Sequence, residues 1–209
     1  MSGVRLVLVR HGESAWNVEE RYQGQADSGL TPAGIDQAAV AAAELRRRFG
    51  EADLVVTSDL PRARDTAYAY TKNVVVDPRL REVNVGSWTG RTFSEIAAAH
   101  PADVAAAADG VDVRRGGGET FAEVRERVWA ALTEAANRAG DGATVVLFTH
   151  GGAIRVAAAA ALSLPLPGHH DLAPPVNTSL TVIAYAAGRA RLVEYNSPTT
   201  REARSTRAD

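Results

Sequence analysis

The chain has no cysteine, and several other features that often reveal a function are missing from it. Without cysteine there is no thiolate catalysis, no disulfide framework and no cysteine-based zinc site. No segment approaches the apolar length of a membrane span, and the N-terminus lacks a basic region followed by a signal-like apolar stretch. The formal net charge of −2 indicates no broad nucleic-acid or anionic-membrane surface. These absences predict a cytoplasmic protein without nucleic-acid or membrane partners.

The 209 residues suffice for one compact domain with a sizeable core. Short apolar runs alternate with helical patterns, such as a helix from Thr31 to about Phe49 and another over Phe121–Arg138. This alternation predicts a three-layer α/β fold with a mostly parallel sheet and helices on both faces. Within a single domain over 1–197, residues 80–118 lose the alternation and are expected to form a small lid. The polar segment 198–209 is predicted to be a disordered tail.

Residues 5–14, RLVLVRHGES, form an apolar strand that ends abruptly in Arg10 and His11. Ligand sites of open α/β sheets lie just beyond the carboxyl ends of the strands. An arginine offers a planar fork of donors to phosphate oxygens, and a histidine can act as nucleophile or proton carrier. This pair therefore indicates a site for a dianionic oxyanion.

Two further apolar strands end in similar residues. After residues 54–56, Ser58 or Asp59 is expected to cap a helix whose first turn holds Arg62, where free N–H groups favour an anion. After residues 144–149, His150 lies at a strand-to-helix junction. Glu82, in the segment LREV (80–83), supplies a carboxyl group. Two histidines and two arginines at strand ends make a constellation suited to phosphate.

The order of these blocks resembles the histidine phosphatase (phosphoglycerate mutase-like) superfamily, in its phosphatase branch, over roughly residues 4–195. The blocks are LVRHGES (8–14), RYQGQADSGLTPAGIDQA (21–38), TSDLPRARDTA (57–67), LREVNVGSWTG (80–90), GGGET (116–120), FTHGGAIR (148–155) and NTSLTVIAY (177–185).

The resemblance implies a role for each site residue. His11 would take the phosphoryl group as nucleophile, and Glu82 would protonate the leaving alkoxide and then activate water. Arg10, Arg62 and a protonated His150 would bind the phosphoryl oxygens. The remaining phosphate-binding candidates are Asn17, Gln23, Gly24 and Gly151. Because cationic side chains would supply the positive charge, we expect neither a metal nor another cofactor.

Other residues of the same types receive different interpretations. Glu13 and Glu119 are the alternatives to Glu82 as general acid, with Glu13 expected to be structural near a helix start. Arg114 and Arg115 could contact an acidic substrate or form a solvated turn. The three remaining histidines are expected at the surface, and they are His100, His169 and His170.

These observations leave three functions to compare. The first is a metal-independent phosphatase acting on a small phosphorylated metabolite. The second is a phosphoglycerate mutase of the same family, which is less favoured because the lid is short and contains only four arginines: Arg81, Arg91, Arg114 and Arg115. The third is a non-catalytic phosphate-binding module. The identity of the phosphomonoester and the oligomeric state, a homodimer included, stay open.

Overall fold

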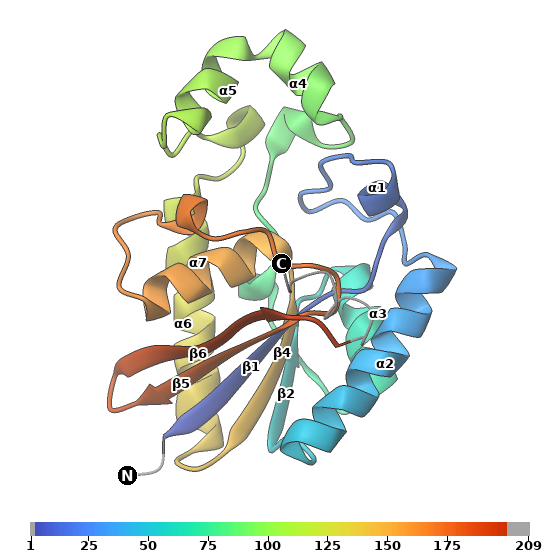
Figure 1. The fold of residues 1–209 in the computed structure, drawn as a ribbon, viewed down its shortest axis with the longest axis vertical. Coiled ribbons are helices and arrows are strands. Elements are labelled where there is room, and N and C mark those ends of the chain that lie inside the picture. Colours follow the sequence, from blue (N-terminus) through green and yellow to red (C-terminus); the bar gives the residue numbers. More distant parts are fainter. Residues whose placement is uncertain (1–2, 200–209) are drawn as a thin grey trace, which may run out of the picture.

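The computed structural model describes residues 3–199, and a six-stranded sheet runs through its centre (Figure 1). The strand order is β3-β2-β4-β1-β5-β6. The pairs β1–β4, β2–β4 and β2–β3 are parallel, whereas β5 runs antiparallel to β1 and to β6. The predicted, mostly parallel sheet is confirmed, with an antiparallel edge. The strands are β1 (Val4–Arg10), β2 (Leu54–Thr57), β3 (Val75–Val76), β4 (Thr144–Thr149), β5 (Leu180–Ala186) and β6 (Arg189–Ser197).

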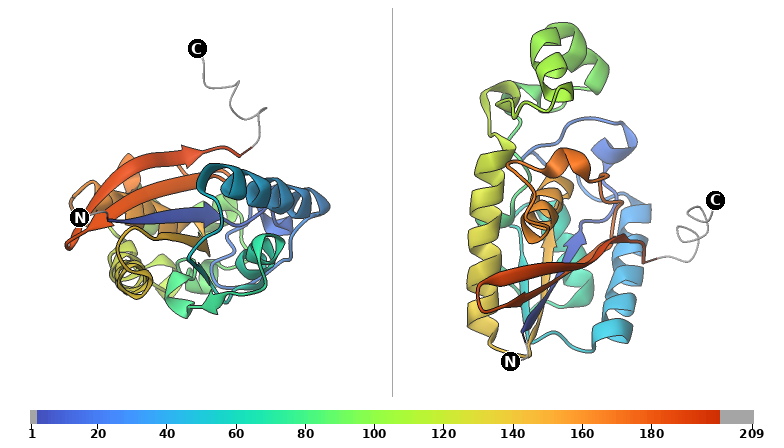
Figure 2. Two further views of the ribbon diagram at one scale, coloured as in Figure 1. Left: turned by 90° about the horizontal axis from the view of Figure 1, so that it is seen from below. Right: turned by 60° about the vertical axis from the view of Figure 1, so that its left-hand side comes forward.

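Helices cover both faces of the sheet, which confirms the three layers. On one face lie α2 (Pro32–Phe49) and α3 (Pro61–Tyr70), and on the other lie α6 (Phe121–Ala139) and α7 (Gly151–Ala161). Figure 2 shows the two helix pairs on opposite sides of the strands. A short helix, α1 (Ala15–Val18), follows the carboxyl end of β1.

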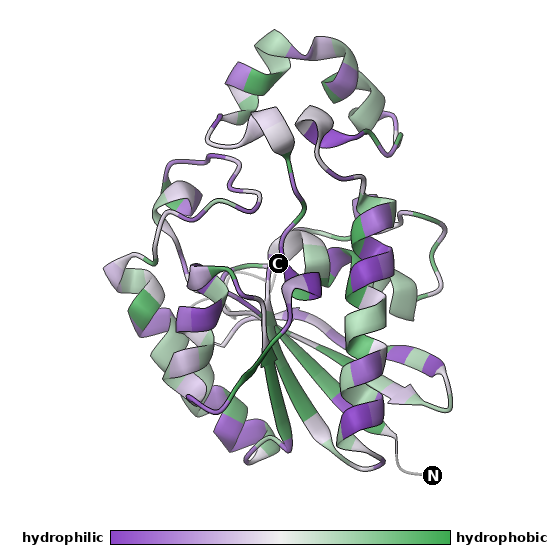
Figure 3. Ribbon diagram, turned by 180° about the vertical axis from the view of Figure 1, so that it is seen from behind, coloured by the Kyte–Doolittle hydropathy of each residue, from purple (hydrophilic) through white to green (hydrophobic). Residues whose placement is uncertain are grey.

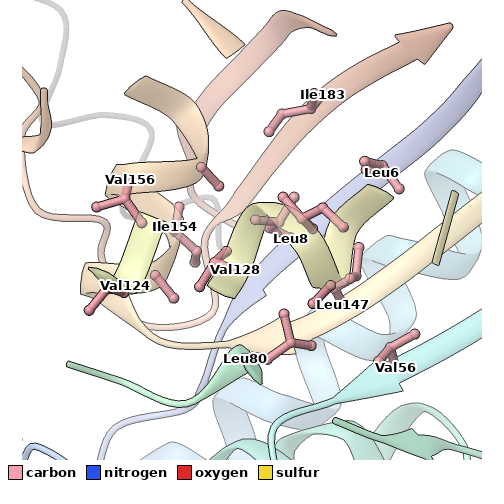
Figure 4. Packing of buried hydrophobic residues seen from close by; sticks show 14 of the residues in the cluster. Leu6, Leu8, Val56, Leu80, Val124, Val128, Leu147, Ile154, Val156 and Ile183 are labelled. Atoms are coloured by element: carbon pink, nitrogen blue, oxygen red, sulfur yellow. The ribbon is translucent and has the colours of Figure 1, made fainter. Parts of the chain in front are cut away.

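Alternation along β1 explains why both faces need cover. Leu6 and Leu8 pack toward α6 and α7 (Figure 4), whereas Val7 and Val9 pack toward α2 and α3. All four side chains are fully buried. Burial of one such side chain stabilises the fold by about 1.5–3 kcal/mol. A strand that is apolar on both faces is stable only between two helical layers.

The helix boundaries follow from local sequence, with one exception. Thr31 caps α2 by accepting a hydrogen bond from the Gly34 backbone N–H at 3.0 Å, and α2 ends at Phe49 as expected. The predicted cap of α3 was wrong, because Leu60 occupies the N-cap position. Asp59 instead forms an ion pair with Arg81.

Most of the predicted lid stands apart from the sheet, beyond the carboxyl ends of its parallel strands (Figure 1), although its first residues, such as Leu80 and Val83, are buried in the core. The lid forms α4 (Phe93–Ala99), α5 (Pro101–Ala108) and single turns of 3-10 helix at Gly86–Trp88 and Arg115–Gly117. Two separate helices form, because Pro101 prevents α4 from continuing. The lid contains both hydrophilic and hydrophobic residues, in contrast to the apolar strands (Figure 3).

The last strand ends at Ser197, and most of the predicted tail, 200–209, lies outside the described residues. Further 3-10 turns occur at Pro78–Leu80 and His169–Asp171. Over residues 3–199, no helix is long and apolar enough to cross a membrane.

Candidate active site

A cavity of about 240 Å³ opens at the carboxyl ends of β1 and β4, below the lid. Eight of the nine predicted site residues line it, and the ninth, His150, packs against His11. Because the parallel strands β1, β4 and β2 end together, residues far apart in the chain meet here. The predicted residues in the wall are Arg10, His11, Asn17, Gln23, Gly24, Arg62, Glu82 and Gly151.

His11 is buried and held in one orientation. Its Nδ1 lies 2.7 Å from the Gly12 carbonyl oxygen, so Nδ1 carries the proton and donates it. Nε2 is therefore unprotonated, and its lone pair accepts a hydrogen bond from Arg62 Nε at 3.2 Å. The tight turn after His11 needs glycine, because a Cβ on Gly12 would lie 2.4 Å from the Gly34 carbonyl oxygen.

Arg62 is the most deeply buried charged residue of the site, with 1% of its surface exposed. It lies in the first turn of α3, as predicted. Nη1 donates to the Ala26 carbonyl oxygen at 2.6 Å, and Nη2 donates to that of Gly24 at 2.8 Å. The guanidinium thus fixes the loop after Gln23 against the histidine while its charge remains in the cavity wall.

His150 packs beside the nucleophile candidate, with the ring centroids of His11 and His150 5.2 Å apart. Its Nε2 is 3.0 Å from the Ser58 hydroxyl, whereas its Nδ1 is buried without a hydrogen-bond partner among the described residues. A buried polar atom without a partner is uncommon in native proteins and requires an explanation. A phosphoryl oxygen is one group that could satisfy it.

Burial sets the protonation of both histidines. Desolvation, followed by the positive charge of Arg62, lowers the pKa of His11 and of His150 well below the usual value. Both rings are therefore neutral at pH 7. Burial and the nearby arginines thus disfavour a positive charge on His150, so the sequence expectation of a protonated His150 stays a prediction for the site with a phosphate bound.

Asparagine side chains and backbone carbonyl groups hold the residues around His11 in the cavity wall. Asn17 Oδ1 accepts from the Asn177 amide at 3.2 Å, and the same amide donates to the His11 carbonyl oxygen at 3.0 Å. Arg10 Nη1 donates to the Pro175 carbonyl oxygen at 2.6 Å, and its Nε is buried without a partner in the described chain. Asn177 is a positioning residue that sequence reasoning did not single out, although it lies in a block of the family pattern.

Glu82 sits against the N-terminus of α7. One carboxylate oxygen accepts from the Gly152 backbone N–H at 3.1 Å and the other accepts from the Val83 N–H at 2.8 Å. A Cβ on Gly152 would lie 2.2 Å from Glu82 Oε1, so only glycine leaves room for the carboxylate. The second glycine of the His-Gly-Gly sequence therefore positions this acid.

The alternative acids have other roles in the structure. Glu13 accepts from the Thr31 hydroxyl at 2.7 Å, next to the start of α2, as a structural residue would. Glu119 forms an ion pair with Arg127 at 2.8 Å. Neither lines the cavity.

The lid arginines do not reach the cavity wall. Arg114 is exposed and paired with Glu123 at 2.6 Å. Arg115 is buried, 3.6 Å from Asp112, and its guanidinium lies over the Phe121 ring at 4.2 Å from the centroid. The solvated-turn interpretation describes Arg114 but not Arg115.

One of the predicted surface histidines is buried. His169 is only 1% exposed, because its ring stacks between Phe121 at 3.6 Å and His170 at 3.9 Å between centroids. Desolvation lowers the pKa of His169 to about 2. His170 is exposed, as expected, and His100 is half-buried near Trp88. Among the described residues, no group of three or more metal-ligating carboxylate or imidazole side chains is placed to hold an ion.

Sequence reasoning missed two further arginines in the cavity wall, Arg21 and Arg155. Arg155 lies on α7, four residues after Gly151, so these two residues share one face of the helix. Its Nε donates to the Leu172 carbonyl oxygen at 3.0 Å. This helical spacing, within the block FTHGGAIR, was the signal that could have identified Arg155.

Residues 6–198 match the model of the histidine phosphatase superfamily (branch 1), and the chain belongs to that family. The predicted family is confirmed. A glucosyl-3-phosphoglycerate phosphatase of Mycolicibacterium vanbaalenii is 37% identical over 86% of this chain and 84% of its own length. A metal-independent phosphoserine phosphatase of Arabidopsis thaliana is 38% identical over 72% of this chain and 65% of its own length.

A solved structure shows the same fold. A mycobacterial glucosyl-3-phosphoglycerate phosphatase, complexed with VO3, is 35% identical to this chain and matches with a TM-score of 0.84. The match covers 92% of this chain and 99% of that protein. With these relatives, the predicted class of enzyme, a phosphatase of the histidine phosphatase type, is confirmed.

Proposed function

We propose that this chain hydrolyses a small phosphomonoester without a metal, through a phosphohistidine on His11. The observation that carries the proposal is the state of that imidazole. Its Nδ1 donates to Gly12, so the lone pair on Nε2 lies beside the Arg62 guanidinium in the cavity wall. A neutral ring with a fixed tautomer is ready to attack, and a neighbouring cation attracts the phosphoryl group.

In the first step, Nε2 of His11 bonds to phosphorus as the bond to the leaving oxygen breaks. Glu82 gives its proton to that oxygen, so the product leaves as an alcohol. In the second step, Glu82 takes a proton from water while the water oxygen bonds to phosphorus and the N–P bond breaks. Phosphate then leaves, and Glu82 is protonated again.

The phosphoryl oxygens would be bound by groups that approach from three sides. Arg10 and Arg62 provide positive charge, and Asn17 and the N-terminus of α7 at Gly151 provide neutral dipoles. The unpartnered nitrogens of Arg10 and His150 favour an oxyanion here, since its oxygens would satisfy them. Such donors stabilise charge that grows in the transition state, which is the function that metals serve in other phosphatases.

The mutase of the same family remains the second candidate, because it would use the same phosphohistidine. The lid favours hydrolysis over return of the phosphoryl group from the histidine to the substrate. Three of its four arginines are already paired with carboxylates of the protein and are not free to hold a second phosphate or carboxylate. These pairs are Arg81–Asp59, Arg114–Glu123 and Arg115–Asp112.

Trapping the intermediate tests the proposal. The protein is briefly incubated with p-nitrophenyl phosphate carrying a radioactive phosphoryl group, in the presence of EDTA, and then denatured. We expect acid-labile, base-stable label on the wild-type protein and none on His11→Ala, together with steady release of phosphate from wild type. Label on a serine or threonine oxygen, or activity that depends on restored zinc or magnesium, would overturn it.

A further inference from the structure

The cavity wall continues along α7 beyond the phosphate end, and Arg155 lines it there. α7 begins at the phosphate end, where His150 is the N-cap and Gly151 lines the wall. Arg155 follows one helical turn later, about 5.4 Å along the axis. Side chains on helices lean back toward the N-terminus, so the Arg155 guanidinium extends over the cavity beside the phosphate end.

The bonding of Arg155 differs from that of the other arginines nearby. Its Nε donates a hydrogen bond to the Leu172 carbonyl oxygen. Within residues 3–199, neither Nη atom has a hydrogen-bond partner and the side chain forms no ion pair. The same wall segment is held again at Pro175 by Arg10. The guanidinium is therefore fixed by one nitrogen, while its two terminal nitrogens remain available in the cavity.

Within residues 3–199, no carboxylate pairs directly with the positive charge of Arg155. Arg21, which lines the same cavity, is paired with Glu19 at 2.9 Å. Glu82, the one acidic residue in the cavity wall, is occupied by the backbone N–H groups of Val83 and Gly152. A half-buried guanidinium with two free terminal nitrogens is suited to a planar, bidentate anion.

Resting on the proposed function, we infer that Arg155 determines substrate specificity by binding a carboxylate on the leaving-group side of the phosphomonoester. The phosphoryl group would lie on His11 and the carboxylate on Arg155, which follows Gly151 at the phosphate end by one helical turn. Such a substrate is a short phosphorylated hydroxy acid or amino acid, because a cavity of about 240 Å³ spans only a few atoms between the two anions. A phosphoester with a neutral leaving group would lack this contact.

The test uses two competitors that differ only in the group of interest. 3-Phosphoglycerate and glycerol 3-phosphate have the same three-carbon skeleton, with a carboxylate in one and a hydroxymethyl group in the other. Their inhibition constants are measured against hydrolysis of p-nitrophenyl phosphate. For the wild-type protein we expect 3-phosphoglycerate to bind at least about tenfold more tightly, as one charge-assisted contact provides.

Arg155→Gln is expected to bring the two constants within about twofold of each other, and Arg155→Lys to restore part of the difference, since it keeps the charge without the fork. Arg125→Gln is the matched control. Arg125 is also half-buried and donates to a backbone carbonyl, that of Leu164 at 2.9 Å, but it lies outside this cavity. It should keep the wild-type ratio.

Equal binding of the two competitors by the wild-type protein would overturn the inference, and so would an unchanged ratio in Arg155→Gln. A general loss of affinity for both compounds, with the ratio kept, would assign Arg155 a purely structural role. These results are separate from failure of the proposed function, which would appear as absent hydrolysis of p-nitrophenyl phosphate by the wild-type protein.

Discussion

The two ends of the cavity are built differently. At the phosphate end, His11, Arg62 and His150 are 2%, 1% and 0% exposed, and each ring or guanidinium is bonded to a fixed protein partner. At the leaving-group end, Tyr22 and Arg155 are half-buried, and the lid above them is separated from the sheet (Figure 1). The buried end therefore suits a chemical step that is the same for every substrate. Residues at the open end can differ according to the substrate without disturbing the core.

The largest effect that would sharpen this comparison is expected at the buried end. Arg62→Ala removes a phosphoryl contact and also releases the Gly24 and Ala26 carbonyl oxygens. We expect kcat/KM to fall about 10²–10³-fold. The loss should be similar for p-nitrophenyl phosphate and an alkyl phosphate, because the phosphoryl group is common to both. Steady-state kinetics with the two substrates measure it.

A loss confined to one of the two substrates would contradict this role for Arg62. Circular dichroism of the variant distinguishes an effect on the site from a failure to fold. Arg62→Lys serves as a partner variant, because it keeps the charge and loses the planar fork.

Glu82→Gln should distinguish protonation of the leaving group from binding of the phosphoryl group. The substitution keeps the shape of the side chain but removes its proton. We expect about 10²–10⁴-fold lower kcat for an alkyl phosphate, whose leaving group needs protonation. For p-nitrophenyl phosphate, which has a good leaving group, the loss should be below about tenfold.

Glu119→Gln is the control for that experiment, because Glu119 is paired with Arg127 outside the cavity. It should leave the ratio of the two substrates unchanged. Equal damage to both substrates by Glu82→Gln would assign the proton to another group.

The smallest expected effect is on the pH dependence of the free energy of unfolding. Burial lowers the pKa of His11, His150 and His169, so these rings stay neutral in the folded protein at a pH where the unfolded chain binds protons. The stabilisation is complete above about pH 6.5 and is lost as the pH falls below it. Each such ring makes the free energy of unfolding fall by up to about 1.4 kcal/mol per pH unit.

Denaturant unfolding between pH 5 and pH 6 measures that slope. His169→Gln should reduce the slope by the contribution of one imidazole. His170→Gln should change the slope less, because His170 is exposed. Equal slopes for wild type and His169→Gln would show that His169 does not stay neutral on folding.

Local sequence was sufficient for much of the fold and the site. Apolar runs located β1, β2 and β4, and Thr31 with Pro32 located the start of α2. The polar residues that follow those strands were expected to meet, since the ends of parallel strands share one edge of a sheet. The order of motifs supplied the family, which the whole-chain match confirms.

Tertiary structure decided what depends on distant segments. His169 is buried because Phe121 stacks on it, and no local pattern places those two residues together. The pKa of His150 is lowered first by burial and then by the charge of Arg62 on α3, so its protonation could not be deduced from its own strand. Arg155 faces the cavity because α7 packs with its N-terminus at the site. A sequence pattern thus determines which residues follow which strands, whereas burial, charge and free hydrogen-bonding groups arise only when those strands are packed together.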